Sequence, residues 1–165
     1  MNWTELIENE IETTYPVTEA LIDMVDGDPL DWKPSTGSNW MTVGQLLYHL
    51  TDACGAAMRG FVTSDWGMPP EGERTEEETL PAVTSVAEAK QLLAEDKKLA
   101  LEMLAQCREE QLADQQVTAP WNPTPKTLGY YLLLMVGHLG QHKSQLFYYL
   151  KLQGKPVHTG HLWGM

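Results

Sequence analysis

Two histidines near the end of the chain stand at a spacing that suits metal binding. His138 and His142 bracket the segment HLGQH and are four residues apart. In a helix, residues i and i+4 lie on one face about one turn apart, so two imidazoles placed in this way can reach the same ion. No glutamate follows the first histidine, so the segment is not the H-E-x-x-H motif of metalloproteases. By itself, such a pair is more often two polar side chains on the flank of a helix.

A third histidine strengthens the metal interpretation. His49 is flanked by Leu46, Leu47 and Leu50 in a predicted helix, so its ring is expected at the core or its edge. A lone core histidine is usually only hydrogen-bonded. If its helix faces the one that carries the pair, however, His49, His138 and His142 form a three-histidine site with open coordination positions. That ligand set is typical of catalytic sites, because structural zinc sites have four protein ligands.

Three further side chains are weaker candidates for the same chemistry. Asp52 lies one turn from His49, where it either accepts the spare N–H of that ring or faces water,. His158 and His161 are spaced for metal binding, but a tail after the last helix is more often packed over an end of the fold or frayed,. Neither tail histidine is expected to be a ligand.

Four residues around the histidines have simpler expected roles. Trp40 and Tyr48 shortly precede His49, and we expect them to line the mouth of a pocket. The two cysteines, Cys54 and Cys107, are too few for a disulfide framework and are expected to be small core residues,.

The sequence predicts that the segments carrying these residues are helices. Apolar residues recur three, four or seven positions apart, and capping boxes begin at Thr42 and Ser85,. Pro16 is expected to kink or divide the first helix. No alternating strand pattern competes, so the sequence predicts an all-α four-helix bundle in one domain over residues 1–165. The expected helices cover residues 3–25, 42–64, 85–112 and 127–153.

The connections between these helices limit the topology. Residues 65–84 form a long link between the second and third helices, and a link of this length can cross the whole bundle,. We therefore expect these two helices to run parallel. Residues 114–126, with three prolines, are expected to form a second long linker.

Composition and charge exclude several function classes. Apolar residues make up 42% of the chain, which is typical of a globular domain,. The formal charge of -12 disfavours nucleic acid and anionic membrane surfaces as partners,. No apolar run could span a membrane and nothing suggests export, so a cytoplasmic protein is expected. No carboxylate follows Asp114, which argues against a di-iron site and leaves the C-terminal part to supply histidine chemistry,.

Two stretches of the chain resemble the DinB/YfiT-like superfamily. They are WMTVGQLLYH, which ends at His49, and HLGQHKSQLFYYLK from His138, followed by the GKP that begins at Gly154. The chain has Gln45 where the family commonly has Glu, and Lys143-Ser144 where Arg-Gly is common. The resemblance implies a four-helix bundle with up-down-down-up topology and a long crossover between helices two and three. It also implies a metal ion, zinc or nickel, on His49, His138 and His142.

The resemblance also suggests an activity. Members of the family include metal-dependent thiol-S-transferases for small bacterial thiols and a maleylpyruvate isomerase. The first hypothesis is therefore a divalent-metal-dependent enzyme that acts on a small molecule, either by transferring a low-molecular-weight thiol co-substrate or by hydrolysis. The rival hypothesis is a non-catalytic metal-binding or stress-associated dimeric protein of the same fold.

The last predicted helix suggests association into a homodimer. Its aromatic and aliphatic residues lie on more than one face, whereas an amphipathic bundle helix needs only one apolar stripe. The alternative is that the long linkers and the tail cover the extra surface within one chain. The residues concerned are Tyr130, Tyr131, Leu133, Leu134, Phe147, Tyr148 and Tyr149.

Overall fold

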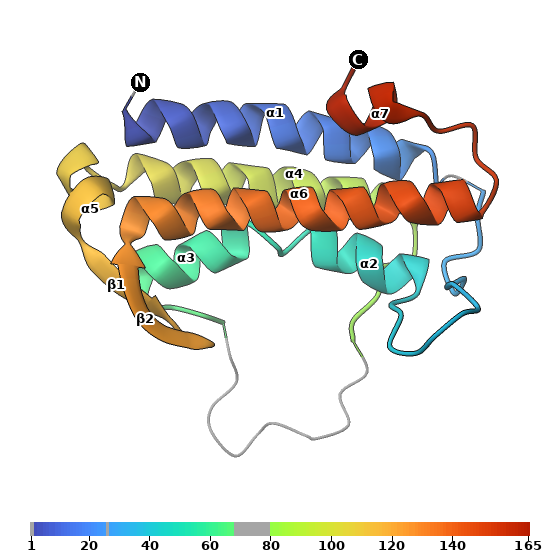
Figure 1. Ribbon diagram of the computed structural model, residues 1–165, viewed down its shortest axis with the longest axis horizontal. Coiled ribbons are helices and arrows are strands. Elements are labelled where there is room, and N and C mark those ends of the chain that lie inside the picture. The colour runs from blue at the N-terminus through green and yellow to red at the C-terminus, as the bar shows by residue number, and fades with distance from the viewer. Residues whose placement is uncertain (1, 26, 68–79) are drawn as a thin grey trace.

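The computed structural model describes residues 2–25, 27–67 and 80–165, and in these residues the chain is mostly helical with one small antiparallel sheet (Figure 1). No helix in this described part is both long and apolar enough to cross a membrane. In chain order the elements are α1 (Trp3–Asp23), α2 (Val43–Leu50), α3 (Gly55–Thr63), α4 (Val86–Ala105), α5 (Glu109–Asp114), β1 (Gln116–Ala119), β2 (Asn122–Thr127), α6 (Leu128–Leu152) and α7 (Thr159–Trp163).

Three long helices and one interrupted helical segment lie along a common direction. Helix α1 packs against α4 and α6, while α3 packs against α4 and α6 from the other side, and α2 packs mainly against α6. Figure 1 shows α2 and α3 end to end beneath α6. Helices α1 and α6 run one way, and α2, α3 and α4 run the other way. The parallel course of α3 and α4 agrees with the long connection between them, of which residues 68–79 lie outside the described residues.

Two of the four predicted helices are interrupted in the structure. The segment expected to be one helix over residues 42–64 is divided into α2 and α3 by a turn at residues 51–54. The predicted helix 85–112 ends at Ala105, and the separate short helix α5 follows. Pro16, in contrast, does not divide α1, which continues through it. The predicted start of α2 is confirmed, because Thr42 Oγ1 accepts from the Gln45 amide and Gln45 Oε1 accepts from the Thr42 amide.

The expected linker over residues 114–126 contains strand β1 and most of strand β2, so the prediction of an all-α chain is wrong. Strands β1 and β2 pair antiparallel, with Gln116 opposite Thr127 and Val117 opposite Lys126. Pro123 and Pro125 concealed this strand, because proline cannot donate to a ladder and demotes a segment as a candidate strand,. In a two-stranded sheet the outer edge of each strand has no neighbouring strand. A proline whose nitrogen lies at that edge therefore costs no hydrogen bond.

One contiguous apolar core joins the helices and sets the position of α2 and α6. The α2 residues Leu46, Leu47 and Leu50 are fully buried, as are Leu132 and Leu139 of α6. Their spacing of three or four residues turns one face of each helix inward. His49 and His138 lie beside these buried positions, so both histidines stand at the edge of the core rather than on the open surface.

Candidate metal centre

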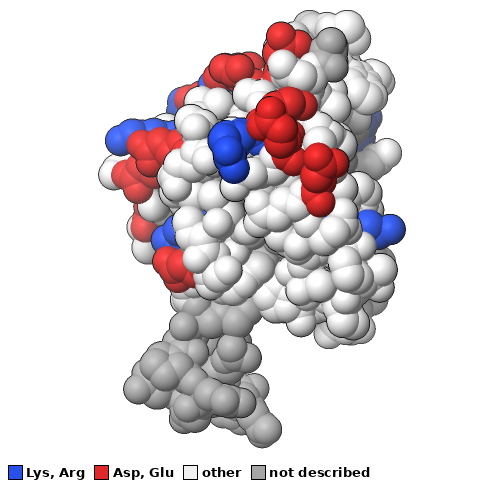
Figure 2. Space-filling model, turned by 90° about the vertical axis from the view of Figure 1, so that its left-hand side faces the viewer, with Lys and Arg blue, Asp and Glu red and all other residues white. Residues whose placement is uncertain are grey.

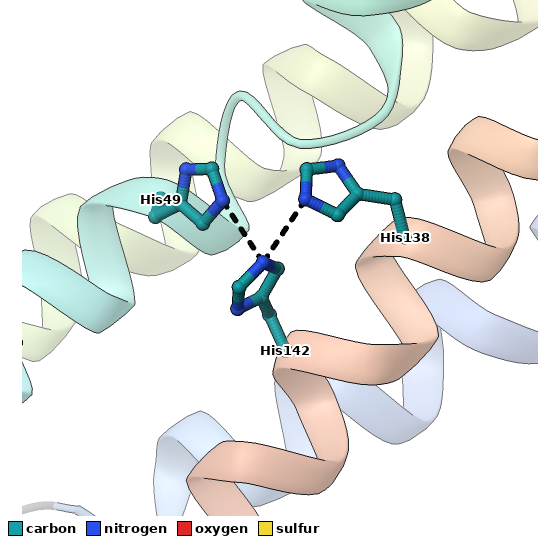
Figure 3. A group of neighbouring side chains, drawn as sticks. All are labelled: His49, His138 and His142. Carbon is teal, nitrogen blue, oxygen red and sulfur yellow. Dashed lines mark hydrogen bonds between the residues drawn. The ribbon is translucent and has the colours of Figure 1, made fainter.

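Three histidine rings point toward one another between α2 and α6. His49 comes from α2, and His138 and His142 come from successive turns of α6 (Figure 3). The Nε2 atom of His142 lies 3.1 Å from that of His49 and 3.0 Å from that of His138. The donor atoms of all three lie within 4.8 Å of one another. The structure thus brings together the three residues that their spacing and sequence context singled out.

The outer nitrogen of each ring faces a hydrogen-bond acceptor. His49 Nδ1 lies 3.2 Å from Asp52 Oδ1, and His138 Nδ1 lies 3.2 Å from the Ala53 carbonyl oxygen. His142 Nδ1 lies 2.9 Å from Gln145 Oε1. A carboxylate, a backbone carbonyl and an amide oxygen only accept, so each Nδ1 donates its proton outward. Each Nε2 therefore presents a lone pair to the centre.

Three lone pairs that face one another are suited to a cation. Burial lowers the pKa of His138 and His142 and so favours the neutral form of both rings,. Neutral imidazoles with the outer N–H fixed by an acceptor are the form in which histidine binds metals. In a tetrahedral zinc site with bonds of 2.0–2.1 Å, neighbouring nitrogens are about 3.3 Å apart, and two of the separations here come close to that value. The donor set fits a divalent ion such as zinc or nickel.

The local structure explains how each histidine is held. The turn at residues 51–54 leaves the Ala53 carbonyl free to accept from His138, and it brings the Asp52 side chain beside His49. Gln145 follows His142 by three residues on the same helix face. Its Nε2 donates to the Tyr149 hydroxyl at 3.3 Å, and that hydroxyl donates to the Met41 carbonyl at 2.9 Å. This chain of hydrogen bonds connects His142 to the residues just before α2.

The sequence interpretation found some of these supporting groups and missed others. Asp52, one of whose two expected roles is to accept from His49, does contact His49 Nδ1, although its side chain is also 46% exposed. Gln145 was not assigned a role, and its place three residues after His142 was the signal available. The Ala53 carbonyl had no signal, because its availability depends on a helix interruption that the periodicity conceals.

Two cavities border the histidines. One of about 300 Å³ is lined by His49 and Asp52 together with Met41, Gln45, Tyr48, Leu80 and Pro81. A second of about 240 Å³ is lined by His138 with Trp121, Leu134, Met135 and Gln141. The expected pocket role of Tyr48 is therefore confirmed, whereas Trp40 packs edge-on against Tyr149. The two cavities therefore touch different histidines, the first His49 and the second His138.

The remaining candidates lie apart from this centre. His158 Nδ1 accepts from the Gly160 amide at the start of α7, and His161 Nδ1 accepts from the His158 amide. Among the described residues, the group able to hold a metal consists of His49, His138 and His142 alone. Both cysteines are free thiols. Burial raises the pKa of Cys54 to about 12, so this thiol stays protonated and packs in the core as expected.

Comparison with known proteins places this chain in a family. A sequence profile of the DinB superfamily matches residues 10–146, a span that contains all three histidines. A DinB-like protein of Bacillus subtilis has a similar crystal structure, with a TM-score of 0.65 and 22% identity over 92% of this chain and 94% of that one. A protein of Exiguobacterium sibiricum assigned to the DinB family gives a TM-score of 0.66 and 19% identity over 98% of each chain. No curated protein shows a significant match. With most of its length matched by the family profile, the chain belongs to the DinB superfamily.

Proposed function

We propose that the protein is a divalent-metal-dependent enzyme that acts on a small molecule, with the ion held by His49, His138 and His142. The observation that carries the proposal is the direction of the three lone pairs, since every Nδ1 is engaged by an acceptor and every Nε2 faces the centre. When bound, a divalent ion in a site with three protein ligands lowers the pKa of a thiol or water that it contacts and polarises an electrophile.

Transfer of a low-molecular-weight thiol is the reaction we favour. The two cavities meet different members of the histidine group, which provides room for a thiol and an electrophile as separate molecules. In such a transfer the sulfur forms a bond to carbon and the leaving group departs with its electron pair. The thiol proton passes to solvent or to Asp52, whose carboxylate lines the larger cavity.

Hydrolysis of a small ester or amide is the second enzymatic candidate. It requires only one organic substrate, so the larger cavity beside His49 and Asp52 would be sufficient. The non-catalytic alternative is a protein in which the ion braces α2 against α6 without turnover. We also propose that the chain is one domain with a four-helix bundle whose second helix is interrupted, and that it works in the cytoplasm, where unpaired cysteines such as Cys54 and Cys107 persist,.

Metal content and thiol consumption test the proposal together. Protein purified without chelators should contain about one zinc or nickel ion per chain. The loaded protein should consume a small thiol in the presence of chlorodinitrobenzene and release chloride. The His49→Ala variant should bind the metal too weakly to keep it through purification and should lose the activity.

A matched control separates the centre from the other histidines. His161→Ala removes an imidazole of the tail that lies outside the group and should keep the metal content and turnover of the wild type. Bound metal without turnover of thiols or esters would favour the non-catalytic alternative. Protein that takes up no zinc or nickel would refute the proposed function.

A further inference from the structure

A buried carboxylate on α4 contacts the backbone just after the turn that separates α2 from α3. Asp96 is only 4% exposed, and its hydrogen bonds go to residues other than the three histidines. Its Oδ2 accepts from the Tyr15 hydroxyl of α1 at 2.6 Å and from the Gly55 amide at 3.0 Å. Its Oδ1 accepts from the Ala56 amide at 2.9 Å. One side chain therefore links α1, α4 and the start of α3.

Asp96 performs for α3 the task that an N-cap residue usually performs. The residue before α3 is Cys54, which makes no side-chain cap hydrogen bond. The first amides of a helix have no partner within it, and they also carry partial positive charge. The carboxylate of Asp96 supplies both the acceptors and the compensating charge from another helix. A new helix can therefore begin at Gly55 without a capping residue of its own.

The close approach of α3 to α4 is built into the sequence at Gly55. A Cβ atom added there would lie 2.7 Å from Asp96 Oδ1 and 3.0 Å from the Ala100 amide nitrogen, and closer still to the Asp96 carbonyl oxygen. Real Cβ atoms do not approach other atoms so closely, so only glycine permits this contact. The position of the 51–54 turn is thus fixed by α4 through both a backbone approach and a side chain.

A backbone carbonyl of the same turn contacts one of the histidines. Ala53, two residues before Gly55, directs its carbonyl at His138 Nδ1. A shift of the turn would move this carbonyl and release the ring, because a ligand's outer nitrogen is oriented by its acceptor. We infer that Asp96 is a positioning residue for the histidine centre, acting on His138 through the turn at residues 51–54. The inference rests on the proposed metal site.

Zinc affinity of two matched variants tests this role. Asp96→Asn keeps the shape but places an amide NH₂ against a backbone donor, so the turn should shift. Its zinc affinity, measured by competition with a chromophoric chelator, should fall by about tenfold, the usual effect of losing a supporting group around a metal ligand. Tyr15→Phe removes a hydrogen bond from the same carboxylate but leaves the Gly55 and Ala56 amides in place. It should lower the unfolding temperature and keep the wild-type affinity.

The same substitution in a protein that already lacks His138 tests whether Asp96 acts through that ring. In a His138→Ala protein, Asp96→Asn should cause no further loss of zinc affinity, because the ring that it orients is gone. A full additional loss there would overturn the route through His138. Wild-type affinity in the Asp96→Asn protein, together with a lowered unfolding temperature, would reduce Asp96 to a cap of α3 and overturn the inference.

Hydrogen exchange in the wild-type protein gives the same test without a variant that must fold. Coupling is reciprocal, so zinc should slow exchange at the Gly55 and Ala56 amides. The Glu88 amide, capped by Ser85 at the start of α4, is the control and should not change. Equal exchange at Gly55 and Ala56 with and without bound zinc would refute the coupling. Failure of the wild-type protein to bind zinc is a different outcome, which removes the proposed function itself.

Discussion

His138 and His142 are partly buried, and this burial decides how the centre responds to acid. It lowers the pKa of both rings from the ordinary value of 6.5. An imidazole must be neutral to donate its lone pair, so a lower pKa means that protons displace the metal only at lower pH. Zinc affinity should persist somewhat below pH 6.5 and then fall steeply, because several rings protonate together.

Chelator competition over a series of pH values checks this expectation. The pH at which half of the zinc is released should lie below 6.5. A midpoint above that value would show that burial does not keep the rings neutral. Affinity that stays constant down to about pH 4.5 would indicate carboxylate ligands instead of imidazoles.

Gln145 is the group that orients His142, so its loss should weaken metal binding. Gln145→Leu removes the acceptor of His142 Nδ1 while keeping a side chain of similar size. Zinc affinity should fall by about tenfold, and the ring should lose its preference for one tautomer, which nitrogen NMR of the imidazole can detect. Gln91→Leu, the same change on the exposed surface of α4, should leave both quantities unchanged.

The sequence identified the three central histidines but only part of their support. Two of them are four residues apart in a helix and the third lies beside buried leucines, and both signals are local. The Nδ1 acceptors are less visible. Asp52 and Gln145 lie three residues from their histidines and are within reach of pattern analysis. The Ala53 carbonyl is not, because backbone groups carry no sequence signal.

At the level of the elements, sequence patterns predicted the helices better than their interruptions. The apolar face of residues 42–64 continues in phase across the 51–54 turn, so periodicity indicates one helix where there are two. Gly55, where α3 begins after the turn, is hydrogen-bonded to Asp96, 41 residues away, and such a distant partner is invisible to local periodicity. The hairpin β1–β2 was missed for a different reason, because its second strand contains two prolines.

Gly55→Ala should be among the more damaging single substitutions in the chain. The added methyl would collide with the Asp96 backbone, which cannot move as a flexible side chain can. We expect a loss of about 2 kcal/mol in the free energy of unfolding, as in other overpacked sites.

Gly137→Ala on α6 is the matched control. A Cβ atom there meets nothing within 4 Å, so alanine should stabilise the helix by about 0.5–1 kcal/mol,. Urea unfolding of both metal-free variants measures the difference. A neutral result for Gly55→Ala would show that α3 can separate from α4 at little cost.

On the scale of the whole molecule, we propose a homodimer, which exposed aromatic side chains support. Trp121, Tyr130 and Tyr148 are 60%, 44% and 61% exposed, and the tail does not hide them. Figure 2 shows the end of the molecule that carries α5 and the hairpin, where acidic groups gather in the upper part and broad areas below them are uncharged. In such a dimer we expect the partner chain to cover some of these exposed aromatic side chains.

Light scattering tests this association. Twice the chain mass of 18.5 kDa is expected at moderate concentration. Replacing Tyr148 by Glu should shift the mass toward one chain, whereas Tyr130→Phe should not. A mass of one chain that persists as the concentration rises would contradict the dimer.

Two of the three histidines are close together in the sequence and the third is far from them, which has a consequence for folding. His138 and His142 are neighbours on one helical face, so even an unfolded chain that forms a single turn there offers an ion two ligands. His49 lies 93 residues before His142 and joins them only after α2 has docked on α6. Ligand bound equally by both states stabilises neither, so the gain in unfolding temperature from zinc should come from His49. His49→Ala should abolish that gain while weak zinc binding by the unfolded chain continues, as calorimetry in denaturant can measure.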